Sequence, residues 1–410
     1  MTVGIESINF YGGIAFLDVR RLFEARNLDL RRFDNLMIHR KSVALPCEDP
    51  VSFGVNAAKP LLDQLSEEER NRIELLVTAT ESGLDFGKSL STYLHDYLGL
   101  SRWCRLFEVK HACYAGTAAL QMAVNFVAAR SSPGAKILVV ATDIAKAAIK
   151  GSYVEPSQGA GAVALLVSER PDILEIDFGA SGYYSYEVMD SCRPTAEIET
   201  GDSDLSLVAY LDCLENSFGA YTTRVEGADF VSTFDYMAFH TPFPGIVKGA
   251  HRMMLRKLKG FPPATSDADF EQRVRPSLTY CLEIGNIYSA TLYLALCGLI
   301  DAVDLPTAKR VALYSYGSGC CSEFFSGIIT PKSKMKMSAL QKRDSLSKRY
   351  ELTVQEYDRL LDLGLEWLFG TKDKEVDTSP YQEIYDRSMT GRGLLVLKKV
   401  ANYHREYQWS

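Results

Sequence analysis

The sequence predicts an α/β fold built from two similar halves, with one active site between them. In the first half a strand, a turn of small residues, a buried helix and a second strand follow one another. The same order returns in the second half, although the residues themselves are not repeated. The apolar, β-rich run over residues 73–80 is typical of a parallel strand that is buried on both faces. Strands that alternate with helices in this way predict parallel pairing within the first half.

Length and composition exclude several classes of protein. The chain has 410 residues, of which 47% are hydrophobic and 24% charged, as in an ordinary globular protein with a large core. A net charge of −7 argues against nucleic acid as a general partner. The sequence predicts no signal peptide and no membrane-spanning helix. Nine cysteines without regular spacing indicate a reducing compartment, so we expect a cytoplasmic protein without a disulfide framework or a metal motif.

Several elements are expected before the first candidate site residue. The sequence predicts a strand over residues 3–10, a helix over 17–26 and a helix over 49–65 that contains Pro60. Ser66 and the glutamates that follow it predict the first turn of a short helix. A basic cluster between the first two helices favours a solvated face over a binding site: Arg31, Arg32, Arg40 and Lys41.

Glu81 directly follows the predicted strand over residues 73–80 and is the first candidate for catalysis. Open α/β sheets bind their ligands at the carboxyl ends of the strands. Burial at such a place would raise the pKa of the carboxyl group and prepare it for proton transfer. The alternative is a structural glutamate that caps the next helix or pairs with Lys88.

Cys113 is the second candidate. Apolar and polar residues alternate over residues 106–110 as in a strand, and apolar residues then recur at helical spacing, which predicts a helix from about residue 114 to 130. Cys113 therefore lies in a strand-to-helix turn, where free backbone N–H groups and the helix dipole would favour a thiolate. The alternative is a small buried cysteine in a well-packed turn. Small residues after it would leave room for a substrate: Ala115, Gly116, Ala118 and Ala119.

The remaining elements complete the duplicated pattern. A long apolar helix is expected over residues 284–303. The charged residues 332–348 are predicted to form a surface excursion, and residues 354–368 an exposed amphipathic helix. Further strands are predicted over residues 136–141, 158–167, 173–178 and 310–316, the last of which ends in Gly317-Ser318-Gly319.

His240 is the third candidate, because it is one of six histidines and lies in an apolar turn fixed by Pro242. A lone histidine in such surroundings is more often a core residue than a catalytic one. Two other histidines compete with it. His111 is close to Cys113 in the sequence but would point across the strand from it, and His251 lies in a basic helix.

That basic helix carries Lys248, Arg252, Arg256 and Lys259 at helical spacing, so they would form one positive stripe. A solvated face is the usual meaning of such a charge run. Because the stripe begins soon after His240, it could also receive a phosphate or an acidic partner near the mouth of the site.

Five short segments follow one another along the chain: Thr-Glu-Ser-Gly at Glu81, His-Ala-Cys-Tyr-Ala-Gly-Thr at Cys113, Phe-His-Thr-Pro-Phe at His240, Gly-Asn-Ile-Tyr-Ser at Asn286 and Tyr-Gly-Ser-Gly at Ser318. Together they resemble the 3-hydroxy-3-methylglutaryl-CoA synthase family over nearly the whole chain. Residues 48–60 and 186–194 are more similar to the branch of that family that works with polyketide synthases and installs β-branches on carrier-protein-bound chains. The resemblance implies a thiolase-like fold, a duplicated five-layer αβαβα arrangement, in a homodimer.

The resemblance also implies a mechanism. Cys113 would take an acetyl group from a donor thioester, while its own backbone N–H and that of Ser318 stabilise the oxyanion. Glu81 would remove a proton from the acetyl methyl group, and the resulting enolate would attack the β-ketone of an acceptor chain that is polarised by His240. Water would then release the product. Asn286 and Tyr288 are implied as contacts on the acceptor side, and Lys248 as a residue near the pantetheine phosphate.

The implied partners are donor and acceptor acyl carrier proteins, and the stripe Lys248, Arg252, Arg256 and Lys259 is the predicted docking surface. No metal or permanently bound cofactor is expected, because the substrates are thioesters on phosphopantetheine or coenzyme A. The expected division is an N-terminal half over residues 1–170 with Glu81 and Cys113, and a C-terminal half over residues 171–410 with His240 and Asn286. Relatives have a longer loop where Lys150 here runs straight into Gly151.

Three alternatives stay open at this point. A hydroxymethylglutaryl-CoA synthase of primary metabolism would use acetyl-CoA and acetoacetyl-CoA. A ketosynthase III-type enzyme would also use a cysteine, a histidine and an asparagine, but its decarboxylative condensation needs no carboxylate base such as Glu81. A carrier-protein scaffold would need no catalytic residues at all.

Overall fold

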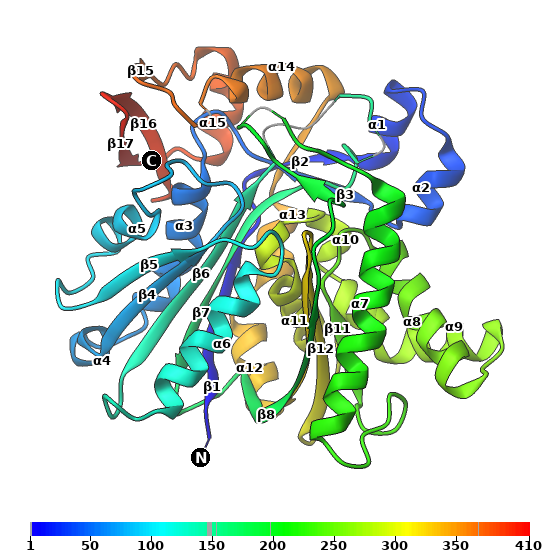
Figure 1. The fold of residues 1–410 in the computed structure, drawn as a ribbon. Helices are drawn as coiled ribbons and strands as arrows, with labels where there is room; N and C mark the ends of the chain where they lie inside the picture. The colour runs from blue at the N-terminus through cyan, green and yellow to red at the C-terminus, as the bar shows by residue number, and fades with distance from the viewer. Residues whose placement is uncertain (1, 146–149, 153, 197, 368) are drawn as a thin grey trace.

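One nine-stranded sheet runs through both halves of the molecule (Figure 1). The computed structural model describes residues 2–145, 150–152, 154–196, 198–367 and 369–410. The strand order is β11-β12-β13-β8-β1-β7-β6-β4-β5, and β8 meets β1 through a short pairing at Gly4 and Ile5. The strands are β1 (Gly4–Tyr11), β4 (Ile73–Ala79), β5 (Arg105–Val109), β6 (Lys136–Ile144), β7 (Ala160–Ser168), β8 (Leu174–Ser185), β11 (Tyr236–Phe239), β12 (Lys309–Gly317) and β13 (Cys321–Ile329).

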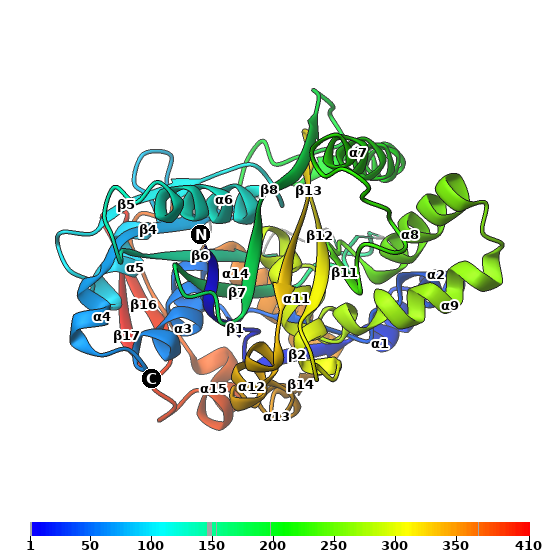
Figure 2. The same ribbon diagram turned by 90° about the horizontal axis from the view of Figure 1, so that it is seen from below.

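The molecule has five layers, because helices cover both faces of the sheet in each half. The central layer holds α6 (Ala115–Ala128) and α11 (Thr291–Ala302), whose apolar side chains share one core with strands of both halves. On the outer face of the first half, α3 (Pro50–Leu62) packs against the alternate residues of β6 and β7. On the outer face of the second half, α7 (Ser203–Arg224) and α8 (Pro244–Lys259) pack against β11, β12 and β13. This is the αβαβα arrangement of the thiolase-like fold, as the sequence predicted (Figures 1 and 2).

Smaller elements surround these layers. The strands β2 (Ala15–Asp18), β3 (Arg40–Val43) and β14 (Tyr350–Leu352) form one small sheet, β9 (Ser191–Cys192) and β10 (Thr200–Gly201) a second, and β15 (Lys374–Glu375), β16 (Leu395–Ala401) and β17 (His404–Trp409) a third. The other helices are α1 (Val19–Ala25), α2 (Leu30–Leu36), α4 (Glu67–Asn71), α5 (Ser91–Tyr97), α9 (Pro263–Arg273), α10 (Cys281–Ile284), α12 (Pro331–Ala339), α13 (Lys342–Ser347), α14 (Val354–Leu365) and α15 (Gln382–Ser388), with 3₁₀ turns η1 (Arg275–Leu278), η2 (Tyr288–Ala290) and η3 (Ser379–Tyr381).

Local signals for the helices are confirmed. Asp49 begins α3 with a capping box in which its carboxylate accepts from the backbone of Ser52, and the helix continues through Pro60. Ser66 caps α4 in the same way, with acidic residues throughout the first turn. No helix within the described residues is long and apolar enough to span a membrane.

The long helix predicted over residues 284–303 is wrong at its start. Gly285 adopts a φ of +82° and Asn286 donates its backbone N–H to the carbonyl of Ser157, so the chain leaves α10 and forms a loop against the other half. The helix resumes as α11 at Thr291. A contact between distant segments therefore overrides the apolar periodicity, and it places Asn286 in a loop instead of a helix.

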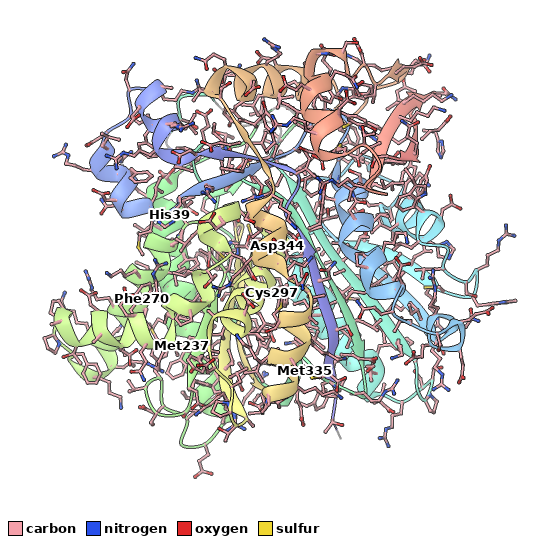
Figure 3. All side chains as sticks on the ribbon, turned by 180° about the vertical axis from the view of Figure 1, so that it is seen from behind. His39, Met237, Phe270, Cys297, Met335 and Asp344 are labelled. Atoms are coloured by element: carbon pink, nitrogen blue, oxygen red, sulfur yellow. The ribbon has the colours of Figure 1, made fainter. Side chains whose placement is uncertain are left out.

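Three other predictions need correction. Pairing in the first half is parallel for β4 with β5 and β6, but β7 lies antiparallel to both β6 and β1. The predicted helix over residues 17–26 begins only at Val19, after the strand β2. The third correction is one of detail: residues 332–348 are mostly exposed, but they fold into α13 and most of α12 instead of an irregular excursion. Figure 3 views this side, where Met335 and Asp344 are exposed while Met337 and Leu346 are buried.

Candidate active site

Glu81 and Cys113 meet at the carboxyl ends of two neighbouring strands. Glu81 follows β4, Cys113 follows β5, and these strands pair in parallel, so both residues leave the same edge of the sheet. The Cys113 thiol donates a hydrogen bond to Oε1 of Glu81 over 3.3 Å. The sequence predicted both residues as separate candidates, and the pairing of the strands brings them into contact.

The turn that carries Cys113 is shaped by packing. Ala112 before it adopts a φ of +40°, which is unusual for a residue with a side chain. A Cβ at Gly116 would lie only 2.2 Å from the carbonyl oxygen of Ser289, so glycine is required where α6 meets η2. The expectation that the small residues make room for a substrate is therefore wrong for Ala115 and Gly116, which are buried against the central layer.

The prediction that Cys113 is a thiolate is also wrong for the free protein. Burial raises the pKa of the Cys113 thiol well above its usual value, and the neighbouring Glu81 carboxylate raises it further. These two effects outweigh the field at the start of α6, which can contribute at most about 2 kcal/mol. The thiol is thus neutral at rest, and a thiolate has to form by proton transfer to a nearby base.

Glu81 is the nearest base, and its pKa is raised to about 8 by burial and by the adjacent carboxylate of Asp143. The predicted rise of this pKa is confirmed. Glu81 does not pair with Lys88, whose ammonium group instead lies near Thr92 and Tyr93. A carboxyl group that titrates near neutral pH can both accept and return a proton.

Asp143 is a site residue that the sequence analysis did not single out. It lies in β6 and is fully buried. Its Oδ1 accepts hydrogen bonds from the backbone N–H groups of Glu81 and Ser82 at 2.8 and 3.0 Å, and from the Thr80 hydroxyl at 2.8 Å. Its Oδ2 accepts from the backbone of Ser289 at 3.1 Å. Asp143 therefore fixes the backbone of Glu81 against the second half of the molecule.

His240 directly follows β11 and is buried. Its backbone is fixed on both sides, because its N–H donates to the carbonyl of Tyr314 at 2.7 Å and its carbonyl accepts from the Tyr210 hydroxyl at 2.8 Å. Burial lowers the pKa of His240 to about 3, so the imidazole is neutral near pH 7. Its Nδ1 is buried without a hydrogen-bond partner among the described residues. A neutral imidazole can donate a hydrogen bond but cannot serve as a cationic acid.

The competing histidines have other surroundings. His251 is buried in the core between α8 and α9, where its Nε2 lies 2.8 Å from a carboxylate oxygen of Asp269. His111 makes a bridge with Cys113 through the backbone, and its ring lies edge-on to Tyr114. These contacts give His251 a structural role and leave His240 as the candidate at the end of a central strand.

The loop after β12 packs directly on the Cys113 turn. A Cβ at Gly317 would lie 2.5 Å from the backbone nitrogen of Tyr114, so glycine allows the two backbones to meet. Asp190 holds this loop from outside: its two carboxylate oxygens accept from the backbone N–H of Gly319 at 2.9 Å and from the Tyr316 hydroxyl at 2.6 Å. Ser318 lies between Tyr316 and Gly319, both bound by Asp190, and next to the turn that carries Cys113.

Asn286 and Tyr288 lie in the loop that the predicted helix would have occupied. The side-chain oxygen of Asn286 accepts from the backbone N–H of Tyr288 and from the Thr291 hydroxyl, each at 2.9 Å. Because the oxygen already accepts two hydrogen bonds, the amide nitrogen is the side-chain atom that can donate to a ligand. The Tyr288 hydroxyl is buried without a partner among the described residues.

The positive stripe on α8 is weaker than its spacing suggested. Arg252 and Lys248 share the carboxylate of Asp267, at 2.6 and 3.6 Å, and Lys259 lies 2.5 Å from a carboxylate oxygen of Asp229. The acidic partners come from other segments, so they could not be identified from the helix alone. Arg256 is exposed on the same helix.

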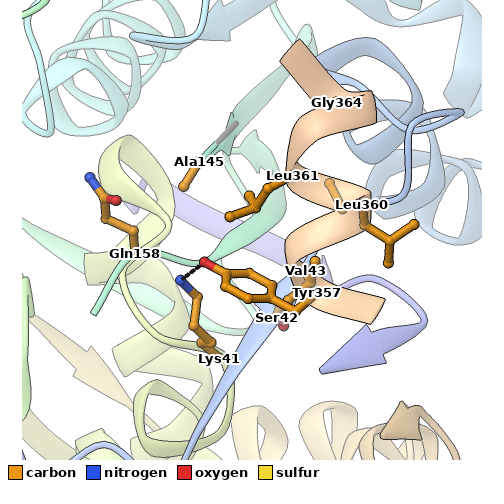
Figure 4. A pocket seen from close by; sticks show the side chains of 10 residues that line it. Lys41, Ser42, Val43, Ala145, Gln158, Tyr357, Leu360, Leu361 and Gly364 are labelled. Atoms are coloured by element: carbon orange, nitrogen blue, oxygen red, sulfur yellow. Dashed lines mark hydrogen bonds between the residues drawn. The ribbon is translucent and has the colours of Figure 1, made fainter. Parts of the chain in front are cut away.

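Lys41 does not lie on a solvated face. It is 2% exposed, and its ammonium group donates to the Tyr357 hydroxyl at 3.1 Å (Figure 4). Burial lowers the pKa of Lys41 to about 7. A small pocket at this place is also lined by Gln158, whose backbone pairs with Asn286. The shorter segment predicted at Lys150 directly follows residues 146–149 in the sequence, which lie outside the described residues.

The described residues contain no group of three or more histidine, cysteine, aspartate or glutamate side chains that could hold a metal ion.

Comparison with known proteins identifies two family models in the chain. The N-terminal domain model of hydroxymethylglutaryl-coenzyme A synthase matches residues 2–172, and the C-terminal model matches residues 255–407. Among named relatives, the Bacillus subtilis polyketide biosynthesis 3-hydroxy-3-methylglutaryl-ACP synthase PksG is 52% identical and covers 100% of this chain and 99% of its own. The hydroxymethylglutaryl-CoA synthase of Enterococcus faecalis is 34% identical over 88% of this chain and 91% of its own.

Solved structures give the same result. The HMG synthase of the curacin biosynthetic pathway in complex with acetyl donor-ACP is 52% identical, covers 100% of both chains and superposes with a TM-score of 0.98. MvaS in complex with 3-hydroxy-3-methylglutaryl coenzyme A is 29% identical, covers 100% of this chain and 99% of its own, and superposes with a TM-score of 0.87.

Proposed function

The chain belongs to the hydroxymethylglutaryl-coenzyme A synthase family of condensing acyltransferases, and from this we propose that it starts β-branching in polyketide biosynthesis. In this proposal an acetyl group from acetyl-acyl carrier protein is added to the β-ketone of a second carrier-bound chain. The hydrogen bond between Glu81 and Cys113 is the observation that best supports this reaction. The identity to PksG and to the curacin enzyme favours a carrier protein over coenzyme A as donor.

In the first step the Cys113 thiol becomes acetylated. Its proton passes to Glu81, which already accepts it in a hydrogen bond, and the sulfur attacks the donor thioester carbonyl. The donor thiolate leaves and takes this proton from Glu81, so that Glu81 is a carboxylate again before the second step. The oxyanion of the tetrahedral intermediate would accept hydrogen bonds from the backbone N–H groups of Cys113 and Ser318, a role supported by the close approach of Gly317 to the Cys113 turn.

In the second step Glu81 removes a proton from the acetyl methyl group. The enolate carbon then forms a bond to the β-carbonyl carbon of the acceptor, and the electron pair of that carbonyl moves to its oxygen. His240, neutral in its buried site, would donate a hydrogen bond to this oxygen, and Glu81 would return its proton to the alkoxide. Asn286 and Tyr288 would contact the acceptor from the other side of the site.

In the last step water cleaves the thioester to Cys113. The carboxylate of the new branch and the free thiol result, so the enzyme returns to its starting state. No redox change occurs, and the hydrolysis of the thioester makes the overall reaction favourable.

Carrier proteins would approach α8, where Lys248, Arg252, Arg256 and Lys259 are the proposed contacts. Lys248 would lie near the phosphate of the pantetheine arm. We further propose that residues 1–170 and 171–410 are the two functional halves, and that the enzyme works as a homodimer, which light scattering in solution would test.

The decisive experiment offers acetyl-carrier protein and acetyl-CoA side by side as donors and follows acetylation of Cys113 by intact mass. Faster loading from the carrier protein supports the branching function. Faster loading from acetyl-CoA would favour a synthase of primary metabolism, and use of malonyl but not acetyl groups would favour a ketosynthase.

A further inference from the structure

Arg193 connects the two sides of the active site and has no assigned role. It follows β9, in a segment that crosses from the oxyanion loop to Glu81. Its Nη1 donates to the backbone carbonyl of Glu81 at 3.2 Å, and its Nη2 lies 2.7 Å from Oε2 of Glu199. Its guanidinium group stands over the ring of Tyr288, with 5.7 Å between its carbon and the ring centre. Arg193 thus touches the base on one side and an acceptor-side residue on the other.

A second contact extends this connection. Oε1 of Glu199 accepts from the side-chain amide of Gln158 at 3.2 Å, and the backbone of Gln158 pairs with Asn286. One chain of interactions therefore runs from Glu81 through Arg193, Glu199 and Gln158 to the acceptor loop.

The side chain of Arg193 is only 18% exposed, and its Nε is buried without a hydrogen-bond partner among the described residues. A purely structural arginine normally has its buried donors paired, since a buried donor without a partner loses its hydration without compensation. Such a donor calls for an ordered water, an ion or a functional role. The guanidinium group also stands over Tyr288, which favours a functional role for Arg193.

The charges around Glu81 make this arginine important. The groups that face the Glu81 carboxylate are Asp143 from β6, Glu199 and Arg193 from the β9–β10 segment, and Cys113 from the turn after β5. Of these four, Arg193 alone carries a positive charge. Asp143 and Glu199 both favour a protonated Glu81, whereas the base must be ionised to remove a proton from the acetyl group.

We propose that Arg193 is a positioning residue that holds Glu81 in place and favours its ionised carboxylate for the condensation step. This inference rests on the proposed function, in which Glu81 is the base. Glu199 orients the guanidinium group of Arg193, but its negative charge acts on Glu81 in the opposite direction. The two residues together therefore set the pH range of the condensation step. Lysine could supply the charge but could not contact both the Glu81 carbonyl and Glu199 in the same planar arrangement.

The sign of the pH effect follows directly. With a Glu81 pKa of about 8, the condensation rate should rise with pH up to that value and then level off. Removal of the Arg193 charge raises this pKa, so the rise should move to higher pH by about one unit or more. Removal of the Glu199 charge has the opposite sign and should move the rise to lower pH.

The test separates condensation from acetylation. Enzyme is first loaded with acetyl at Cys113, and the single-turnover rate of condensation is then measured against pH for the wild type, Arg193→Gln, Arg193→Lys and Glu199→Gln. Arg193→Gln should shift the profile upward, Glu199→Gln should shift it downward, and Arg193→Lys should keep the wild-type midpoint with a lower plateau. Acetylation rates should remain within a few-fold of the wild type.

Arg224→Gln is the matched control. Arg224 also donates to a backbone carbonyl, that of Ser181 at 3.0 Å, and stands over the ring of Tyr183, but it is exposed at the end of α7. It should leave the profile unchanged. A profile that keeps its midpoint in both Arg193→Gln and Glu199→Gln would overturn the inference, even if the rates fell. Condensation by Glu81→Gln at the wild-type rate would instead overturn the proposed function.

Discussion

The two sides of the active site use burial in different ways. On the acyl side, Glu81 and Cys113 are in direct contact and lie beside Asp143. Burial raises the pKa values of all three groups, and neighbouring negative charge raises those of Glu81 and Cys113 further. On the acceptor side, burial alone lowers the pKa of His240, and Asn286 and Tyr288 are neutral. In the proposed function, the first side would move protons and the second would hold a neutral ketone by hydrogen bonds. Changes on the acyl side should therefore stop a chemical step, whereas changes on the acceptor side should weaken binding and polarisation.

Cys113→Ser should have the largest effect. The hydroxyl is a far weaker nucleophile than a thiolate and no base stronger than Glu81 contacts it, so acetyl transfer should fall by on the order of 10³-fold or more. Intact mass after incubation with acetyl-carrier protein measures the transfer. Normal acetyl loading at another residue would show that the nucleophile is misassigned.

Glu81→Gln should come next and should affect the two chemical steps unequally. Condensation should fall about 10²–10⁴-fold, because the amide cannot accept the methyl proton. Acetylation should slow less. Glu81 also accepts the Cys113 proton, but a thiol is far more acidic than an acetyl methyl group and depends less on its base. Rapid-quench measurement of each step tests this division. Equal losses in both steps would mean that Glu81 serves chiefly to activate Cys113.

His240→Ala should lower condensation by about 10²-fold, as for the loss of one donor to a developing oxyanion. Acetylation of Cys113 should be unchanged. Because the imidazole is already neutral near pH 7, the substitution should lower the rate without moving the pH at which condensation rises. If acetylation fell by the same factor, His240 would belong to the acyl side, and the contrast between the two sides would fail.

The stripe on α8 lies outside both sides and should give the smallest effect. Exposed ion pairs contribute about 0–1 kcal/mol each, and their influence falls with salt. Arg252→Glu with Arg256→Glu should raise KM for acetyl-carrier protein several-fold, mainly through a slower association rate. Because Arg252 already pairs with Asp267, most of this change should come from Arg256.

A control pair keeps the same change in net charge. Lys309→Glu with Arg310→Glu alters two cations at the start of β12, the opposite end of that strand from Gly317, and should leave KM unchanged. Turnover with an acetyl-pantetheine mimic should barely respond to either pair. Equal losses with the mimic and the carrier protein would assign the stripe to the fold instead of to docking.

The sequence by itself determined the features that depend on neighbouring residues. The buried strand over residues 73–80, the strand-to-helix turn at Cys113 and the capped start of α3 all follow from short-range periodicity and capping chemistry. The position of Glu81 at the end of a buried strand was sufficient to predict that its pKa is raised. These predictions succeeded because the determining residues lie within a few positions of one another.

The tertiary structure decided what depends on residues far apart in the chain. The thiol state of Cys113 is set by its burial and by Glu81, 32 positions away, and the break before α11 is set by the pairing of Asn286 with Ser157. Lys41 is buried because Tyr357 packs on it, and the α8 stripe is partly neutralised by acidic residues of other segments. Arg193 reaches Glu81 across 112 positions. Desolvation and Coulomb energies depend on distance in space, and that distance is fixed only when the chain has folded.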